Sequence, residues 1–330
     1  MRVYQFRHPG YSKEAVVKWI GKINTLLQSA KGFTNEGESY FCTEFSVMQD
    51  NGPPQVYFHV GLGKAASTYL QYKVFPKLKG IHYIQRTSYK KSKKIIARAN
   101  SDKYLVSREF DRQLEDEVRW FSSFCPEARV IIIFRRHDSW IASQYRRHVK
   151  NGNSYSFSEF IDIENDNGFW KKKELCFFEK IKTIEQYFQH KPLVLFHDEL
   201  KKDPYKFINK IADFTCSTYK QEAISLSPKH RSYNEKQLKI MRKVSRYVYI
   251  PGQNEQGNKL QRRLQLYSKR LVCYVVLYAA LFVPKRLVSK KKLILQAELD
   301  KIREYFEEDW QRCLNYAKDN NPVTEQVANA

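Results

Sequence analysis

The sequence has few cysteines and no paired cysteine motif. Its six cysteines are scattered along 330 residues without a C-x-x-C pair. This pattern excludes a zinc site with the usual ligand spacing and gives no indication of a disulfide framework. We therefore expect mostly buried free thiols, which suit a reducing cytosol. The first residues, MRVYQFRHPGYSKEAVV, lack the apolar core of a signal peptide, so a cytoplasmic location is the default expectation.

Acidic residues are also scarce. The chain has 35 Asp and Glu against 58 Lys and Arg, which gives a formal net charge of +23. Such an excess favours polyanionic partners: nucleotides, nucleic acid, acidic polysaccharide or an anionic membrane surface. No helix-turn-helix, zinc knuckle or RNP-like aromatic strand is recognisable, so we do not expect nucleic acid as a partner. Hydrophobic residues make up 42% of the chain, which is enough to build a core and argues against global disorder.

One apolar segment, LVCYVVLYAALFV at residues 271–283, has 13 uncharged residues with basic residues on both sides. As a helix it would reach about 20 Å, short of a bilayer core of roughly 30 Å. Between residues 256 and 297 there is no acidic residue, whereas ten Lys or Arg occur. Two interpretations stay open: a buried core helix with basic ends, or a membrane-surface segment over residues 269–292 whose basic flanks contact anionic lipid.

The distribution of breakers and apolar runs predicts the domain organisation. The stretch QDNGPPQ separates an N-terminal appendage, residues 1–50, from the main domain, residues 51–330. In the main domain, strand patterns alternate with helix patterns, which predicts an α/β fold with a central parallel sheet and helices on both of its faces. After about residue 235 the chain is mainly helical and basic. The expected strands are residues 56–61, 104–110, 128–136 and 192–200.

A candidate anion-binding loop follows the first expected strand, in the stretch HVGLGKAASTYLQ. Backbone N–H groups at the start of the next helix, and the helix dipole, favour a negatively charged ligand. We expect Gly61 and Gly63 to let the backbone turn tightly and Lys64 to add a full positive charge. Ser67 and Thr68 follow as hydroxyl donors.

A second candidate phosphate contact lies in VIIIFRRHDSWIASQY. Arg135 stands just past the end of a β-branched strand, and Ser143 follows eight residues later on an expected helix. In a parallel sheet, ligands gather at the carboxyl ends of the strands. An Arg and a Ser there are suited to hold a phosphate by charge-assisted hydrogen bonds.

These segments, in this order, resemble the sulfotransferases that use 3′-phosphoadenosine 5′-phosphosulfate (PAPS). GKAASTYLQ is similar to their 5′-phosphosulfate loop, PKxGTTxLQ, and RRHDSWIASQY to their 3′-phosphate segment, RxPxxRxxSxY. VLFHDELKKDP resembles their later strand and turn, YEDLxxDP. KHRSYNEKQLKIMRKVSRYV resembles a basic helical segment of bacterial carbohydrate sulfotransferases. The resemblance spans roughly residues 56–250. It implies that the fold is a P-loop-like three-layer sandwich with a mainly helical C-terminal part.

The sequence departs from the family pattern at several loop positions. The family's proline before the lysine is Gly63, its first loop glycine is Ala66 and its first threonine is Ser67. Its proline in the 3′ segment is His137. If position 66 requires a positive φ or a close approach to phosphate, alanine is poorer there than glycine.

The resemblance implies PAPS as the donor, adenosine 3′,5′-bisphosphate (PAP) as the product, and no metal. Lys64 would contact the bridging oxygen between sulfate and 5′-phosphate. Arg135 and Ser143 would bind the 3′-phosphate, with Arg231 as a further contact. The 5′-phosphate loop would consist of Gly61, Gly63, Lys64, Ala65, Ala66, Ser67 and Thr68.

The acceptor hydroxyl needs a general base. Glu109, in YLVSREF, resembles the S-x-E element of carbohydrate sulfotransferases and is the best candidate, with His82 and His148 as alternatives.

The predicted function is transfer of a sulfuryl group from PAPS to a hydroxyl of a polysaccharide, oligosaccharide or glycolipid. We expect a cytoplasmic enzyme, with a peripheral position on the inner face of the membrane as a further option. Two alternatives stay open. A P-loop kinase-type phosphotransferase would depend on Mg²⁺ and would not need the pair Arg135 and Ser143. A non-catalytic basic protein would bind polyanions or membranes through its charge alone.

Overall fold

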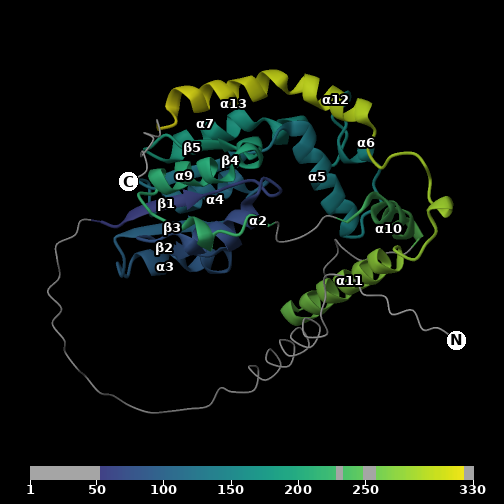
Figure 1. Ribbon diagram of the computed structural model, residues 1–330, viewed down its shortest axis with the longest axis horizontal. Coiled ribbons are helices and arrows are strands. Elements are labelled where there is room, and N and C mark those ends of the chain that lie inside the picture. The colour runs from purple at the N-terminus through teal and green to yellow at the C-terminus, as the bar shows by residue number, and fades with distance from the viewer. Residues whose placement is uncertain (1–52, 228–232, 248–257, 323–330) are drawn as a thin grey trace, which may run out of the picture. The chain divides into compact units, whose positions relative to one another are not determined.

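The computed structural model describes residues 53–227, 233–247 and 258–322 (Figure 1). The expected appendage, residues 1–50, lies outside these described residues, and so does Arg231. The domain boundary and the role of Arg231 therefore stay predictions.

The centre of the fold is a sheet of five parallel strands in the order β2-β3-β1-β4-β5. Strand β4 is almost wholly buried along the run RVIIIF, as expected for a β-branched strand that is covered on both faces. The predicted central parallel sheet is confirmed. The strands are β1 (Gln55–His59), β2 (His82–Ile84), β3 (Lys103–Ser107), β4 (Arg129–Phe134) and β5 (Leu193–Phe196).

Helices cover both faces of this sheet. The α-helices are α2 (Ser67–Tyr69), α3 (Ser92–Ile96), α4 (Leu114–Ser122), α5 (His137–Lys150), α6 (Phe157–Phe160), α7 (Phe177–Tyr187), α8 (His197–Lys202), α9 (Pro204–Phe214), α10 (Glu235–Tyr247), α11 (Lys259–Ala279), α12 (Gln296–Tyr305) and α13 (Glu307–Asn320). Successive β1 residues point to opposite faces. Phe58 stacks on Phe121 of α4, with ring centroids 4.0 Å apart. Tyr57 meets Phe214 of α9 at 5.8 Å. These contacts give the three layers that the alternating pattern predicted.

All four expected strands end earlier in the structure than the sequence pattern predicted, and two of these differences concern the residues around the site. The strand expected over residues 192–200 ends at Phe196, because the next residues form helix α8. The Glu199 carboxylate accepts a hydrogen bond from the backbone N–H of Phe196, which is a helix-capping interaction. The strand expected over residues 104–110 ends at Ser107, which leaves the following residues in a loop at the edge of the sheet.

The C-terminal part is helical, as predicted, from α10 to α13 (Figure 1). Helix α11 packs against α10, where the side-chain amide of Gln237 donates to the carbonyl of Leu277 at 2.9 Å. Cys273 and Leu277 are buried on this side, but Leu271 and Val275 are each 60% exposed. The interpretation of residues 271–283 as a buried core helix is therefore wrong, because only one face of the helix is covered. Among the helices that the structure describes, none is long and apolar enough to cross a membrane.

Candidate active site

The loop after β1 leaves the carboxyl end of the strand in the middle of the sheet. Lys64 and Ala66 take the left-handed conformation, with φ of 69° and 67°. The left-handed conformation of the loop does not use Gly61 or Gly63, neither of which has positive φ. They provide space instead. A Cβ at Gly61 would lie 2.5 Å from Nε2 of His59, and one at Gly63 would lie 3.1 Å from the Arg147 guanidinium.

The peptide groups of Gly63 are held by side chains from α5 and from the loop that follows β3. The Gly63 N–H donates to Oδ1 of Asp111 at 2.9 Å, and its carbonyl accepts from the indole of Trp140 at 2.8 Å. Asp111 is bound in turn by Arg147 at 3.0 Å and by Gln144 at 3.3 Å. This clamp orders the loop through Gly63 and leaves the later amides of the loop available.

The sequence reasoning missed this clamp. Trp140, Gln144 and Arg147 are spaced four and three residues apart, so they lie on one face of α5. Asp111 lies four residues after the end of β3, at the carboxyl edge of the sheet. The helical spacing indicates that these three side chains lie on one face of α5. Which residues that face contacts depends on how α5 packs in the fold, so the sequence alone does not show it.

The loop offers backbone amides to a ligand. In the described part of the chain, no group accepts a hydrogen bond from the N–H groups of Lys64, Ala66, Ser67 or Thr68. The Ser67 hydroxyl is buried and donates to the carbonyl of Leu62 at 2.9 Å, which differs from its expected role as a phosphate donor. Because several N–H groups point out of one turn next to a lysine, the loop is suited to bind an anion.

A neutral polar layer lies beneath the loop. Nδ1 of His59 and Oγ of Ser107 are 2.8 Å apart, and the Gln71 amide donates to the same hydroxyl at 3.1 Å. Burial lowers the pKa of His59 to about 3, so the ring stays uncharged at physiological pH. These residues therefore support the loop without adding charge to the site.

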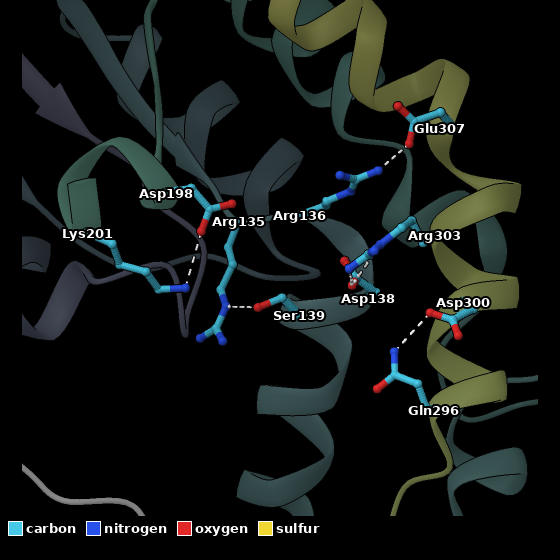
Figure 2. A network of polar contacts seen from close by, with 10 residues as sticks. All are labelled: Arg135, Arg136, Asp138, Ser139, Asp198, Lys201, Gln296, Asp300, Arg303 and Glu307. Carbon is cyan, nitrogen blue, oxygen red and sulfur yellow. Dashed lines mark hydrogen bonds and ion pairs between the residues drawn. The ribbon is translucent and has the colours of Figure 1, made fainter.

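Arg135 connects the two candidate phosphate contacts. It follows the last residue of β4, and its Nη1 donates to the carbonyl of Lys64 at 3.4 Å. Its Nε donates to Oγ of Ser139 at 2.7 Å, while Asp198 and Lys201 lie on its other side (Figure 2). Ser143, half-buried, lies one helical turn beyond Ser139 on the same side of α5. Arg135 therefore lies next to the Lys64 loop. Ser143 lies one turn of α5 away from Ser139, the residue that Arg135 contacts.

Positive charge is concentrated around Lys64. Its side chain is exposed, yet its pKa is lowered by partial burial and then by Arg147, Lys150 and Arg135. The carboxylate that acts in the opposite direction is Glu109. A site where cations outnumber their counterions attracts and concentrates anionic ligands.

Glu109 lies across from the loop, two residues after the end of β3. The Thr68 hydroxyl is 3.5 Å from its Oε1. Burial raises the pKa of Glu109 above its usual range, Asp111 adds to this, and Arg86 and Arg147 oppose it. A carboxylate with a raised pKa at the edge of an anion site is suited to accept a proton.

The two histidine alternatives lie elsewhere. His82 is the first residue of β2, at the amino end of the strand and therefore at the opposite edge of the sheet from the loop. The ring of His148 packs between Phe160 and Phe169, with centroids at 4.9 and 5.3 Å, and burial lowers its pKa to about 4. Of the three candidate bases, Glu109 adjoins the loop. Within residues 53–227, 233–247 and 258–322, no group of three or more His, Cys, Asp or Glu side chains is arranged to hold a metal ion.

Comparisons with known proteins give weak similarities. No protein-family model matches the chain, and no curated protein matches it either. A sulfotransferase from Alicyclobacillus acidocaldarius is 13% identical, with a TM-score of 0.41 over 68% of this chain and 94% of that one. The mouse sulfotransferase SULT7A1, complexed with PAP, is 16% identical, with a TM-score of 0.39 over 82% of this chain and 90% of that one. At these scores the similarity carries no conclusion about activity.

Proposed function

We propose that this chain transfers a sulfuryl group from PAPS to a hydroxyl group of a carbohydrate. The observation that carries the proposal is the contact between the Arg135 guanidinium and the backbone of Lys64, at 3.4 Å. Two basic residues that follow different strands, Lys64 after β1 and Arg135 after β4, therefore lie next to each other at one edge of the sheet. A nucleotide with phosphate groups on both its 3′ and 5′ oxygens fits two adjoining anion sites better than one with a single phosphate chain.

The residues present fit such a donor. The N–H groups of Lys64, Ala66, Ser67 and Thr68, which have no protein acceptor in the described part of the chain, would bind its 5′ end. Arg135 and Ser143 would bind the 3′-phosphate, which ATP does not have. The donor supplies the sulfuryl group and departs as PAP.

Lys64 and Glu109 would perform the chemical step. Lys64 would neutralise the negative charge that develops on the oxygen between sulfur and the 5′-phosphate as that S–O bond breaks. Glu109 would take the proton of the acceptor hydroxyl as the new S–O bond forms. The hydrogen bond from Thr68 to Glu109, at 3.5 Å, supports a base that is close to the anion loop. The raised pKa of Glu109 makes its ionised form a stronger base.

Support for a carbohydrate acceptor comes from two features. The residues from Ser107 to Glu109 resemble the S-x-E element of carbohydrate sulfotransferases. Arg86 and Arg147 lie near enough to Glu109 to lower its pKa, so the acceptor side of the site is also cationic. Such surroundings favour an acidic sugar or a sugar that already carries sulfate.

Nucleotide binding tests the donor. We expect PAP to raise the melting temperature without added metal, and ADP and ATP to have much smaller effects. Stabilisation by ATP with Mg²⁺ alone would favour the kinase-type alternative. No stabilisation by any nucleotide would favour a non-catalytic basic protein.

Turnover tests the reaction. Incubation with labelled PAPS and a panel of cell-envelope glycans should give products that carry an added sulfate, detected by mass. Lys64→Ala should remove this product, while Lys94→Ala, which changes an exposed lysine on α3, should retain it. Equal activity in both variants would contradict the assigned role of Lys64.

A further inference from the structure

Helix α11 has an exposed apolar stripe along one side. Its members recur every three or four residues, so they line up along about 21 Å of helix. The stripe consists of Leu264, Tyr267, Leu271, Val275 and Tyr278, which are 48% to 65% exposed. The opposite side of the helix, at Cys273 and Leu277, is buried against α10.

Apolar exposure continues after the helix. Phe282 is 88% exposed and Leu287 is 69% exposed. Large apolar side chains in such a contiguous arrangement are uncommon on the free surface of a soluble domain and mark an interaction surface.

Positive charge surrounds this surface. No acidic residue occurs from 256 to 297, and the exposed cations near the stripe include Arg270, Lys285 and Arg286. An apolar helix face with basic flanks is complementary to an anionic membrane surface, where the apolar groups enter the interface and the cations contact head groups. The tyrosines in the stripe fit the same place, because their amphipathic rings are favoured at the boundary between water and lipid.

A basic hollow lies beside α10, with a volume of about 490 Å³. The exposed Leu287 lines it, so the hollow borders the segment that follows α11. Its lining also includes Glu298. The basic residues that line it are Lys239, Arg242, Lys243, Arg246, Lys291 and Lys292. A hollow with this excess of cations is suited to hold an anionic head group.

Helix α11 also reaches the neighbourhood of the candidate active site. The ammonium group of Lys150, at the end of α5, lies 5.9 Å from the ring centroid of Tyr274 on α11. Lys150 is one of the cations that lower the pKa of Lys64. A membrane bound along α11 would therefore lie close to the site where the acceptor hydroxyl reacts.

We propose that the stripe on α11 docks this protein on an anionic membrane surface, where the acceptor is a carbohydrate anchored in the same membrane by a lipid. The docking part stands on the surface of α11 alone. The choice of a glycolipid acceptor rests on the proposed sulfotransferase function.

Vesicle flotation of the full chain tests the docking. Vesicles of phosphatidylcholine with about a third phosphatidylglycerol should carry the protein, and vesicles of phosphatidylcholine alone should carry much less. The double change Leu271→Asp and Val275→Asp should weaken binding to the anionic vesicles at least about tenfold. Leu226→Asp, a control at an exposed leucine outside α11, should leave binding unchanged. Equal binding by the double variant and the control would overturn the proposal.

Solvent accessibility of the stripe distinguishes a membrane from other binding partners of the same surface. Hydroxyl-radical labelling of Tyr267 and Leu271 in the full chain should be strong in buffer and should fall when anionic vesicles are added. Weak labelling in buffer would mean that residues 1–52 or a second copy already cover the stripe, which would overturn the proposal. Sedimentation velocity would then distinguish these two occupants.

Two further measurements separate this proposal from the proposed function. PAP-induced stabilisation of the double variant should equal that of the unchanged protein, which also shows that the variant folds. Turnover of a glycolipid embedded in anionic vesicles should fall with vesicle binding, whereas turnover of the same sugar in water-soluble form should not. An equal loss on both acceptors would contradict membrane docking as the cause. Absence of turnover on both, with vesicle binding retained, would contradict only the enzymatic assignment.

Discussion

The loop after β1 and the surface of α11 differ in how completely the fold holds them. Gly63 in the loop is bonded through both its N–H and its carbonyl by side chains that lie 48 and 77 residues away in the sequence. In α11, one side packs against α10 and the other leaves Leu271 and Val275 exposed. The loop is therefore ordered before any ligand arrives, and α11 presents a surface that something else must cover.

This difference indicates two kinds of recognition. A small charged ligand such as a nucleotide needs donors in fixed positions, because each misplaced hydrogen bond weakens binding and catalysis. A membrane needs area and charge, and tolerates variation in individual contacts. Single substitutions in the loop should therefore strongly weaken nucleotide binding or catalysis. On the exposed side of α11, membrane binding should weaken in proportion to the number of apolar side chains removed.

The largest effect is expected from Lys64→Ala. Removal of the charge that neutralises the leaving oxygen should lower kcat by about a thousandfold, as loss of a transition-state donor does in other enzymes. Binding of PAP should weaken less, because the loop amides and Arg135 remain. Single-turnover kinetics and PAP titration measure the two quantities separately. If kcat and the affinity for PAP fall by the same factor in this variant, Lys64 binds the donor without acting on the transition state.

Glu109→Gln should lower kcat by about a hundredfold, because it removes the general base. Burial raises the pKa of Glu109, so the acid limb of kcat/KM should lie above the pH expected for an ordinary glutamate. The raised pKa also means that stability is lost as pH rises through it, since the folded state holds the proton more tightly than the unfolded chain. The variant should therefore resist urea better than the unchanged protein at neutral pH, and this advantage should disappear below the pKa of an ordinary glutamate. Glu222→Gln, at an exposed position, should change neither property.

A matched pair on α11 sharpens the contrast between its two sides. Leu277→Ala should lower the free energy of unfolding by about 2–3 kcal/mol, because the side chain is fully buried against α10. Leu271→Ala should change it by less than about 0.5 kcal/mol, because its side chain is 60% exposed. Urea denaturation in the absence of lipid measures both. A large loss from Leu271→Ala would mean that the stripe is already covered within the protein.

The parts of the fold that were predictable are those with strong local signals. The buried β-branched run at Arg129–Phe134 indicated a central strand, and the strand-then-helix order indicated parallel pairing. Helix α8 was not predicted because the strand was expected to continue to Leu200, and the start of the helix depends on capping by Glu199. Strand β2 has only three residues at the edge of the sheet, too few for a recognisable period.

The site divides in the same way. Lys64, Arg135 and Glu109 follow strand ends, where parallel topology predicts a ligand, and the structure brings them to one edge of the sheet. Asp111 and Arg147 were not predicted, since their function is to bind each other and the loop, and that depends on tertiary packing. The sequence pattern also could not tell that the two glycines are required for space and that Lys64 and Ala66 take the left-handed turn.

Substitution of Gly61 and Gly63 by alanine tests whether the loop needs these glycines because a side chain would not fit there. Gly61→Ala should destabilise the protein by about 1–2 kcal/mol, because its Cβ would lie 2.5 Å from the buried ring of His59. Gly63→Ala should cost less, because the nearest atoms are the ends of the Arg147 and Asp111 side chains, both farther away at 3.1 Å. Chemical denaturation of both variants gives the ranking. The reverse order would mean that the Asp111 clamp, and not the space around His59, limits the loop.

A small effect is expected at Ala66, where φ is 67° in the left-handed region. This conformation costs an L-residue roughly 1–2 kcal/mol, whereas glycine adopts it freely but loses about 0.5–1 kcal/mol more chain entropy on folding. Ala66→Gly should therefore stabilise the protein by about 0.5 kcal/mol. Its neighbour Ala65 is fully buried and does not have positive φ, so Ala65→Gly should destabilise it by about 1 kcal/mol. Paired urea titrations resolve this sign difference, and destabilisation by both changes would show that the loop tolerates alanine at position 66 without strain.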